Sequence, residues 1–187
     1  MDVLCDALGT CRSLKDISFS KNNLGIDDFV ETSDSDDSLM SDDGESKARR
    51  NRRLNQAEDT CMTQLIADLS HSKPEMDRLC LAHCYFHDRG MKILAAELNK
   101  SRLRYVNISW CKMTAESVPS LVKFIKDNKF LEKLLMQHND IYEAIEQQEG
   151  SNAAMKKIIM AIKKHQSLKY LDISATKFGS QNFRLLL

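Results

Sequence analysis

The stretch LRYVNISWCKM, from Leu103 to Met113, has apolar residues at its first, fourth, sixth and eleventh places and a cysteine at its ninth. In a strand, alternate side chains point to opposite faces. The fourth and sixth places would then point inward, while the third and fifth would point outward. The stretch therefore predicts a short strand with one buried face, followed by a turn.

The same pattern, L-x-x-L-x-L-x-x-N/C-x-L, occurs five times along the chain. The five stretches begin at Leu14, Met76, Leu103, Leu131 and Leu168. In each of them an aliphatic residue, Met or Phe fills all four apolar places. The ninth place reads Asn22, Cys84, Cys111, Asn139 and Thr176. Because such self-similarity is the signature of repeat architectures, we expect a repeating structural unit, with places numbered 1 to 11 in each repeat.

Amphipathic stretches lie between the five patterns. They begin at Val3, Cys61, Gly90, Ala115 and Ala153. In one of them Met91, Leu94, Ala95 and Leu98 follow the i, i+3, i+4, i+7 spacing, which builds one apolar stripe along a helix. One strand followed by one helix is therefore the predicted unit, and the predicted fold class is α/β.

At these residues the chain resembles the leucine-rich repeat family. Steps of 27 and 28 residues separate the patterns that begin at Met76, Leu103 and Leu131, and this length is similar to the long repeats of the ribonuclease-inhibitor-like subclass. The resemblance implies a solenoid of about five repeats, with a curved parallel sheet on its concave side and α-helices on its convex side. It also implies that the concave face holds another protein.

Charge is unevenly distributed along a chain whose 27 basic and 27 acidic residues give a formal net charge of zero. Nine acids and no base lie between Asp27 and Glu45, and five bases follow between Lys47 and Arg53. With so few apolar residues this segment is expected to be disordered. The predicted organisation is a partial helix and first repeat strand at 1–30, an insertion at 31–56, and the rest of the same domain at 57–187, with repeats starting near 76, 103, 131 and 168. A degenerate repeat is the alternative to an insertion, but the pattern cannot be drawn through 31–53.

The insertion contains two candidate sites. Ser33 has an acid three residues downstream, which acid-directed kinases prefer. The basic run is a candidate nuclear address or phosphate-binding patch, and a solvated linker is the alternative interpretation. Its residues are Lys47, Arg49, Arg50, Arg52 and Arg53.

A second stretch, LCLAHCYFH, has zinc-like spacing at Cys80, His83, Cys84 and His87. The repeat pattern contradicts a metal site there. Cys80 would lie on the outward face, whereas Cys84 at the ninth place would point inward, so the four side chains would not converge on one ion. We therefore predict no metal site and, because no secretory signal precedes them, reduced cysteines.

Outward places supply the candidate protein-binding surface. Tryptophan, tyrosine and arginine are enriched at interface hot spots because they offer large contact areas. Trp110 is the only tryptophan, and the alternative is that it packs on its neighbours at a solvated edge. The candidate protein-binding residues are Arg78, His83, Tyr105, Trp110, Leu135, His138 and Tyr170.

Catalytic signatures are missing from the sequence. It contains neither a phosphate-binding glycine-rich loop nor an H-E-x-x-H motif, so we expect no enzymatic activity and no cofactor. The expected function is non-catalytic protein recognition or a scaffold role in a larger assembly. The alternative is a regulator of another enzyme, similar to the repeat-containing activators of small GTPases or to nuclease inhibitors.

The expected partners are proteins, rather than nucleic acids or small molecules. The sequence contains no run of about 18 apolar residues, so we expect no membrane insertion, and no signal peptide is recognisable. The expected location is intracellular, most simply the cytoplasm, with a cytoskeletal or ciliary assembly or the nucleus as alternatives.

Overall fold

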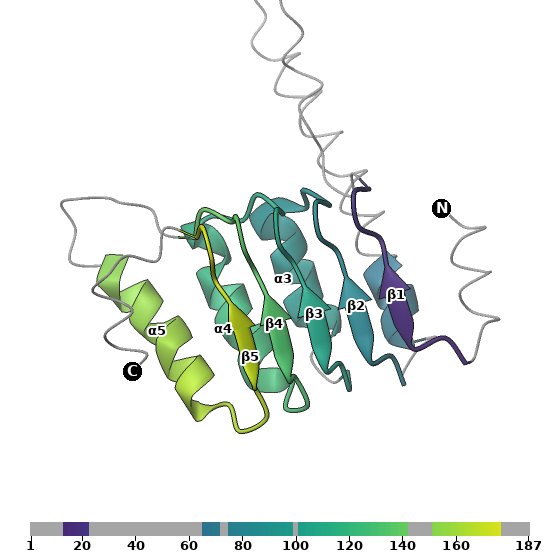
Figure 1. Ribbon diagram of the computed structural model, residues 1–187. Helices are drawn as coiled ribbons and strands as arrows, with labels where there is room; N and C mark the ends of the chain where they lie inside the picture. Colours follow the sequence, from purple (N-terminus) through teal and green to yellow (C-terminus); the bar gives the residue numbers. More distant parts are fainter. Residues whose placement is uncertain (1–12, 23–64, 72–74, 99–100, 142–150, 177–187) are drawn as a thin grey trace, which may run out of the picture.

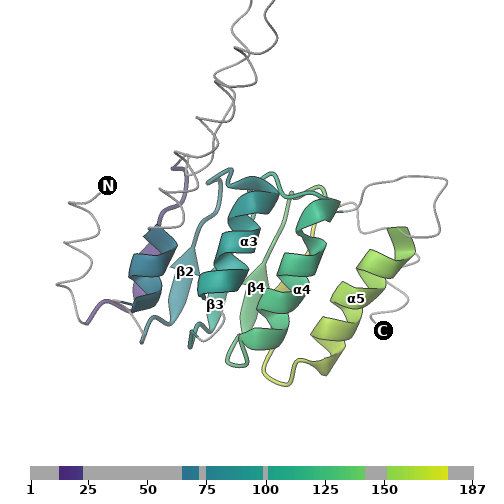
Figure 2. The same cartoon turned by 180° about the vertical axis from the view of Figure 1, so that it is seen from behind.

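A parallel β-sheet with helices on one face forms the two layers of the protein (Figure 1; Figure 2). The computed structural model describes residues 13–22, 65–71, 75–98, 101–141 and 151–176. Its sheet has five strands in sequence order. They are β1 (Asp16–Ser18), β2 (Arg78–Cys80), β3 (Tyr105–Asn107), β4 (Lys133–Leu135) and β5 (Tyr170–Asp172). The predicted α/β class with a parallel sheet is confirmed.

Helical segments connect each strand to the next, because parallel strands require a crossover. The described helices are α3 (His87–Glu97), η1 (Ala115–Ser117), α4 (Val118–Asp127) and α5 (Ser151–Lys164), and residues 65–71 are also helical. Helix α4 packs between α3 and α5, and Figure 2 shows this layer from its outer side. Among the described helices, none has the length and apolar character needed to cross a membrane.

The strands pair in register, place for place. Third-place residues face each other across the whole sheet, as in the pairs Arg78 with Tyr105 and Tyr105 with Lys133. Fourth-place residues are buried under the helices in β1 to β4, and Leu171 of β5 is partly buried. Residues that occupy the same place of the repeat pattern therefore form a row across the sheet.

The apolar core lies between the two layers. Sixth-place residues such as Leu81 and Ile108 meet helix residues such as Leu94 and Phe124 in one continuous cluster. Full burial of each such side chain contributes about 1.5–3 kcal/mol. The predicted insertion at 31–56, including Ser33 and the basic run Lys47–Arg53, lies outside the described residues, as does the amphipathic stretch that begins at Val3.

Buried ninth-place side chains join consecutive repeats. Asn139 accepts hydrogen bonds through Oδ1 from the backbone N–H groups of Cys111 (3.0 Å) and Met113 (3.2 Å) of the preceding repeat. Its Nδ2 donates to the carbonyl oxygens of Ile108 (2.9 Å) and Met136 (3.0 Å). One amide thus satisfies four backbone groups in two repeats.

Cysteines at the ninth place also join consecutive repeats, with fewer hydrogen bonds than Asn139. The thiol of Cys84 donates to the carbonyl oxygen of Phe19 at 2.9 Å, and the thiol of Cys111 donates to that of Leu81 at 3.1 Å. Both acceptors stand at the sixth place of the preceding repeat. The prediction that Cys84 at the ninth place points inward is confirmed, and Cys111 is buried in the same way.

Gly90 lies inside a helix that begins three residues earlier than the amphipathic stretch that starts at this glycine. It is the fourth residue of α3 and is buried. A Cβ atom there would lie only 2.5 Å from the Cβ and Cδ2 atoms of Phe86. Glycine is therefore required by the close approach of the Phe86 ring to the helix.

Second-place residues alternate in charge across the sheet. Arg104 Nε lies 3.4 Å from the Asp77 carboxylate, and Lys169 Nζ lies 2.8 Å from the Glu132 carboxylate. The hydrogen bond from Lys169 lowers the pKa of Glu132 below its usual range. Such exposed pairs add little stability. If a strand paired with the next strand but one, however, like charges of this row would lie side by side. The complete row is Lys15, Asp77, Arg104, Glu132 and Lys169.

The ladder of bonds through Asn139 leads to a stability prediction. Replacing Asn139 with Ala leaves two buried N–H groups without their acceptor, which should lower the free energy of unfolding by about 3 kcal/mol. Urea unfolding followed by circular dichroism measures this loss. Asn107→Ala is the matched control, because its side chain accepts one local bond from Ser109 N on a half-buried surface. Equal losses in the two variants would contradict the proposed role of the ladder.

Candidate functional site

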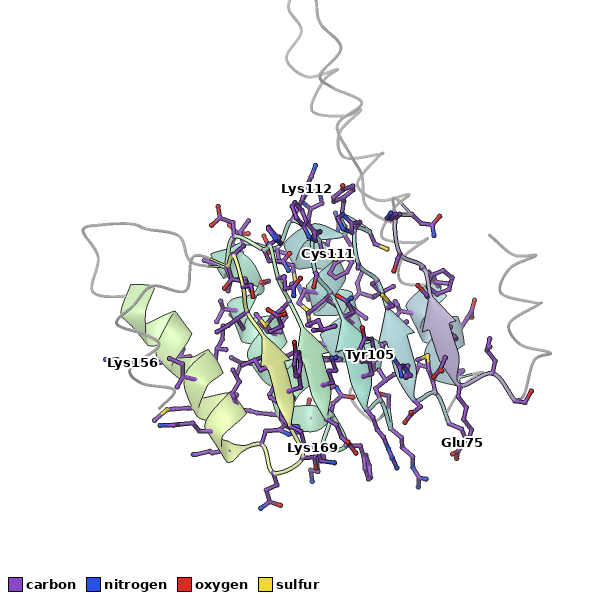
Figure 3. The ribbon with its side chains drawn as sticks, in the orientation of Figure 1. Glu75, Tyr105, Cys111, Lys112, Lys156 and Lys169 are labelled. Atoms are coloured by element: carbon purple, nitrogen blue, oxygen red, sulfur yellow. The ribbon has the colours of Figure 1, made fainter. Side chains whose placement is uncertain are left out.

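The sheet face opposite the helices has no described helix on it, and we call it the open face (Figure 1; Figure 2). Its side chains come from the third and fifth places of the strands, which flank the buried fourth place. Figure 3 shows Tyr105 in front of the sheet and Lys112 at the edge where the strands end. This is the face that the sequence predicted to bind a protein.

Cations and aromatic rings alternate along the third place, and we call these residues the third-place row. The guanidinium carbon of Arg78 lies 4.5 Å from the centre of the Tyr105 ring, and Lys133 Nζ lies 5.7 Å from it. The same ammonium lies 4.2 Å from the centre of the Tyr170 ring. Cation–π attraction therefore holds four neighbouring side chains in one ordered row, Arg78, Tyr105, Lys133 and Tyr170.

Fifth-place residues add polar and apolar groups above that row. Asn107 and Asp172 each accept the backbone N–H two residues further on, at 3.0 Å. Asp172 also accepts from the Ser174 hydroxyl and from Gln137 Nε2. These bonds, that of the Ser174 hydroxyl first, hold the pKa of Asp172 below its usual range. Leu135 lies between the two residues, half-buried.

Three stacked rings stand at the eighth place, beyond the strand ends, and we call them the ring stack. The imidazole of His83 lies 5.1 Å from the indole of Trp110, with 13° between their planes. The imidazole of His138 lies 3.8 Å from the other face of the indole, at 16°. Trp110 is 41% exposed although both of its ring faces are covered, so it presents mainly its edge.

The backbone at the eighth place is left-handed in all five repeats. The φ angles are 64° for Lys21, 58° for His83 and Trp110, 52° for His138 and 53° for Ala175. This conformation costs a residue with a Cβ about 1–2 kcal/mol. It is compensated in part by hydrogen bonds such as Trp110 N to Gln137 O, at 2.9 Å. The turn thus aims eighth-place side chains past the strand ends.

The structure divides the predicted binding residues between two rows. Arg78, Tyr105 and Tyr170 belong to the third-place row, and the ring stack contains the rest except Leu135. Sequence reasoning missed Lys133, which is not among the candidate protein-binding residues. The alternation of basic and aromatic residues at the third place is the signal that could have identified it.

Both sequence interpretations of Trp110 describe part of its environment. It packs on its neighbours, as the alternative required, and it also remains exposed. Tyr85 and Lys112 extend the same edge, since Lys112 Nζ lies 5.0 Å from the Tyr85 ring centre. The indole face itself is not free to receive a partner.

The four residues with zinc-like spacing are placed apart. His83 is stacked on Trp110, and His87 is the first residue of α3. Cys84 is buried, whereas Cys80 is half-buried with its Sγ 2.9 Å from Ser20 Oγ. Across the described ranges, no group of three or more His, Cys, Asp or Glu side chains could hold a metal ion.

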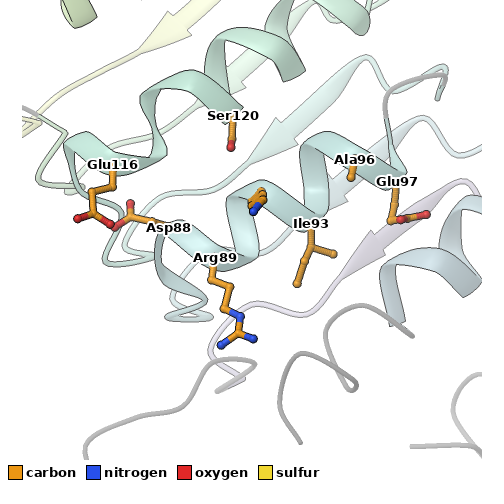
Figure 4. Close-up of a pocket in the computed structure, with 8 residues that line it drawn as sticks. Asp88, Arg89, Ile93, Ala96, Glu97, Glu116 and Ser120 are labelled. Carbon is orange, nitrogen blue, oxygen red and sulfur yellow. The ribbon is translucent and has the colours of Figure 1, made fainter. Parts of the chain in front are cut away.

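Two grooves lie on the helix side. The larger, of about 660 Å³, runs between α3 and the η1–α4 segment (Figure 4). Asp88 at its edge is bonded to the backbone N–H and the hydroxyl of Thr114, both at 2.7 Å, which gives it a structural role. The smaller, of about 360 Å³, includes Lys126 and Lys164 near the ends of α4 and α5. Lysines there complement the negative ends of the helix dipoles.

Buried thiols lead to a prediction about reactivity. Burial raises the pKa of Cys84 from 9.0 to about 11 and that of Cys111 to about 12. At pH 8 both thiols should therefore react with iodoacetamide at least about a hundredfold more slowly in the folded protein than in urea, because the thiolate is the nucleophile. Peptide mapping by mass spectrometry measures each site. Equal rates in the two states would contradict this.

The raised pKa values of Cys84 and Cys111 also define the pH range over which the folded protein loses stability. Because the folded state holds these protons more tightly, the stability they contribute is complete below pH 9. It should decline as the pH rises from 9 towards 11 and 12, where the folded thiols also ionise.

The left-handed turn leads to a prediction about glycine. Ala175→Gly should raise the free energy of unfolding by about 1 kcal/mol, because glycine adopts a positive φ without the steric cost. The control is Ala96→Gly in α3, which should lower it by about 0.5–1 kcal/mol. Thermal or urea unfolding distinguishes the two signs. A loss in both variants would argue against strain at the eighth place.

Comparison with known proteins adds no assignment to this geometry. No family model matches the chain, and no curated protein matches it either.

Proposed function

We propose that this chain is a leucine-rich repeat solenoid of the ribonuclease-inhibitor-like subclass and that it binds a protein partner through the open face, without catalysing a reaction. Five parallel strands in sequence order, each joined to the next through a helix on the same side, support the solenoid. The ninth-place bonds from Cys84, Cys111 and Asn139 support it further, because each links one repeat to the one before.

The observation that supports binding most directly is the order of the side chains on the open face. The third-place row and the ring stack present aromatic and basic groups from neighbouring strands, and no described helix covers them. Aromatic and arginine side chains are the types that dominate binding energy at protein interfaces. Tyr170 is 48% exposed and Trp110 41%, so both offer area that a partner can bury.

A macromolecule suits this face better than a small molecule. The rows cross the strands, and five strands at about 4.8 Å spacing give a width of about 19 Å. Small-molecule sites are concave and enclose most of their ligand. The two described grooves lie on the helix side, away from these rows. An extended row of exposed side chains fits an extended protein surface.

Rigidity is the second physical argument. Side chains that become ordered only on binding cost about 0.5–1.5 kcal/mol each. Here stacking on Trp110 already orders His83 and His138, and cation–π contacts already order Lys133. Because these side chains are already ordered in the folded protein, binding a partner would not carry this entropic cost.

A pair of single substitutions tests this function. Trp110→Ala removes the centre of the ring stack, and affinity purification with quantitative mass spectrometry should show its specific partners reduced at least tenfold. Phe130→Ala is the matched control, because Phe130 is 53% exposed but lies in the turn between α4 and β4, with the Arg102 guanidinium over its ring. Its partners should be retained.

Circular dichroism must first show that both variants remain folded. Partners retained in full by Trp110→Ala and by a Tyr105→Ala, Tyr170→Ala double variant would disprove binding through the open face.

A further inference from the structure

We propose that the third-place row binds an acidic segment of the partner protein, with two carboxylates held by Arg78 and Lys133 on either side of Tyr105. This inference rests on the proposed function and names the chemistry of its partner. The three residues come from the adjacent strands β2, β3 and β4 at one place of the repeat. They lie in the middle of the open face.

No ion pair joins either cation to a carboxylate of another described residue. In the described part of the chain, the ion pairs of the sheet join Arg104 to Asp77 and Glu132, and Lys169 to Glu132. The acids that precede Arg78 and Lys133 in sequence, Asp77 and Glu132, are therefore already paired in the second-place row. They do not neutralise the third-place row.

Two other acids stand beside these cations. Asp16 neighbours Arg78 at the third place of β1, but no ion pair joins the two among the described residues, and the Arg78 guanidinium lies against the Tyr105 ring instead. Asp172 interacts electrostatically with Lys133. Its carboxylate is already held by the Ser174 hydroxyl and backbone N–H and by Gln137. Of the two rings that Lys133 Nζ contacts, the Tyr170 ring is the nearer, with its centre 4.2 Å away. The ammonium thus keeps donors that a partner can use.

The cation–π contacts fix how the row can bind. Both faces of the Tyr105 ring are taken by cations, so the ring offers its edge and its hydroxyl, which has no hydrogen bond to another described residue. The two contact distances limit the separation of the two charges to about 10 Å. Side chains at i and i+2 of an extended chain lie on one side, about 7 Å apart. Two acids at that spacing match the two cations.

Apolar surface beside the row completes the preference. Leu135 is half-buried at the fifth place of β4, and Tyr170 is 48% exposed at the third place of β5. A segment that places its carboxylates over Arg78 and Lys133 brings its flanking residues onto this apolar surface. The expected ligand is an extended acidic segment with apolar neighbours.

The lysines near the ends of α4 and α5 form a different basic surface. Lys126, Lys129 and Lys164 line the smaller groove, but they stand where two helix dipoles are negative. That field opposes an incoming carboxylate. Arg78 and Lys133 are the first residues of β2 and β4 and do not stand at a helix end, so their charge is not reduced in this way.

Selection from a random dodecapeptide phage library tests the proposal without a known partner. The full chain is immobilised beside the double variant Arg78→Gln/Lys133→Gln. The control double variant Lys92→Gln/Lys126→Gln loses the same charge from the helix side. We call Arg78→Gln/Lys133→Gln the open-face variant. Peptides with acids at i and i+2 should be enriched on the unsubstituted full chain and on the control variant, but not on the open-face variant.

A selected peptide then gives the quantitative result. In fluorescence polarisation, the open-face variant should raise its Kd at least tenfold, as should replacing both of its acids with the neutral amides. The control variant should leave the Kd within twofold, and added salt should weaken binding to the full chain.

The outcomes separate this inference from the proposed function. Selected peptides without acid enrichment, or with equal affinity for the open-face variant, would overturn the acidic partner. If those peptides still require Trp110 and Tyr105, protein recognition by the open face stands. If no peptide distinguishes the full chain from a Tyr105→Ala/Trp110→Ala variant, both proposals fail.

Discussion

In-register pairing of parallel strands is the constraint on which the rest of the structure depends. Because each strand meets the next at the same place of the pattern, a residue of β2, β3 or β4 has two neighbours of its own place, about 4.8 Å away. Repeats with identical residues would set like charges side by side. The second-place row avoids this by alternating basic and acidic residues, as in Asp77, Arg104 and Glu132.

The same constraint creates the candidate site. At the third place, a cation on one strand finds an aromatic ring on the next, so Lys133 is shared between Tyr105 and Tyr170. At the eighth place, the left-handed backbone brings successive rings into one stack around Trp110. Glycine would adopt that backbone at lower cost, but it has no ring to contribute. Surface order is therefore obtained at some expense of stability.

Buried polar groups between repeats follow from the pairing as well. Each turn leaves backbone groups inside the protein, and an unpaired one is costly. Asn139 satisfies four of them, whereas the smaller thiols of Cys84 and Cys111 donate to carbonyl groups and stay neutral because burial raises their pKa. Reactivity and metal binding both require a thiolate, so these two cysteines are suited to structure rather than to chemistry.

The sequence by itself determined the α/β class, the five strands and the residues they bury, because the spacing of apolar side chains in a strand or helix is a local property. It also identified the rows of outward residues, since parallel strands repeat one pattern. Only the tertiary structure decided that both faces of Trp110 are covered, that Lys133 contacts the rings of Tyr105 and Tyr170, and that Gly90 makes room for Phe86. Those features depend on contacts between repeats and on backbone angles, and the pattern of residue types contains neither.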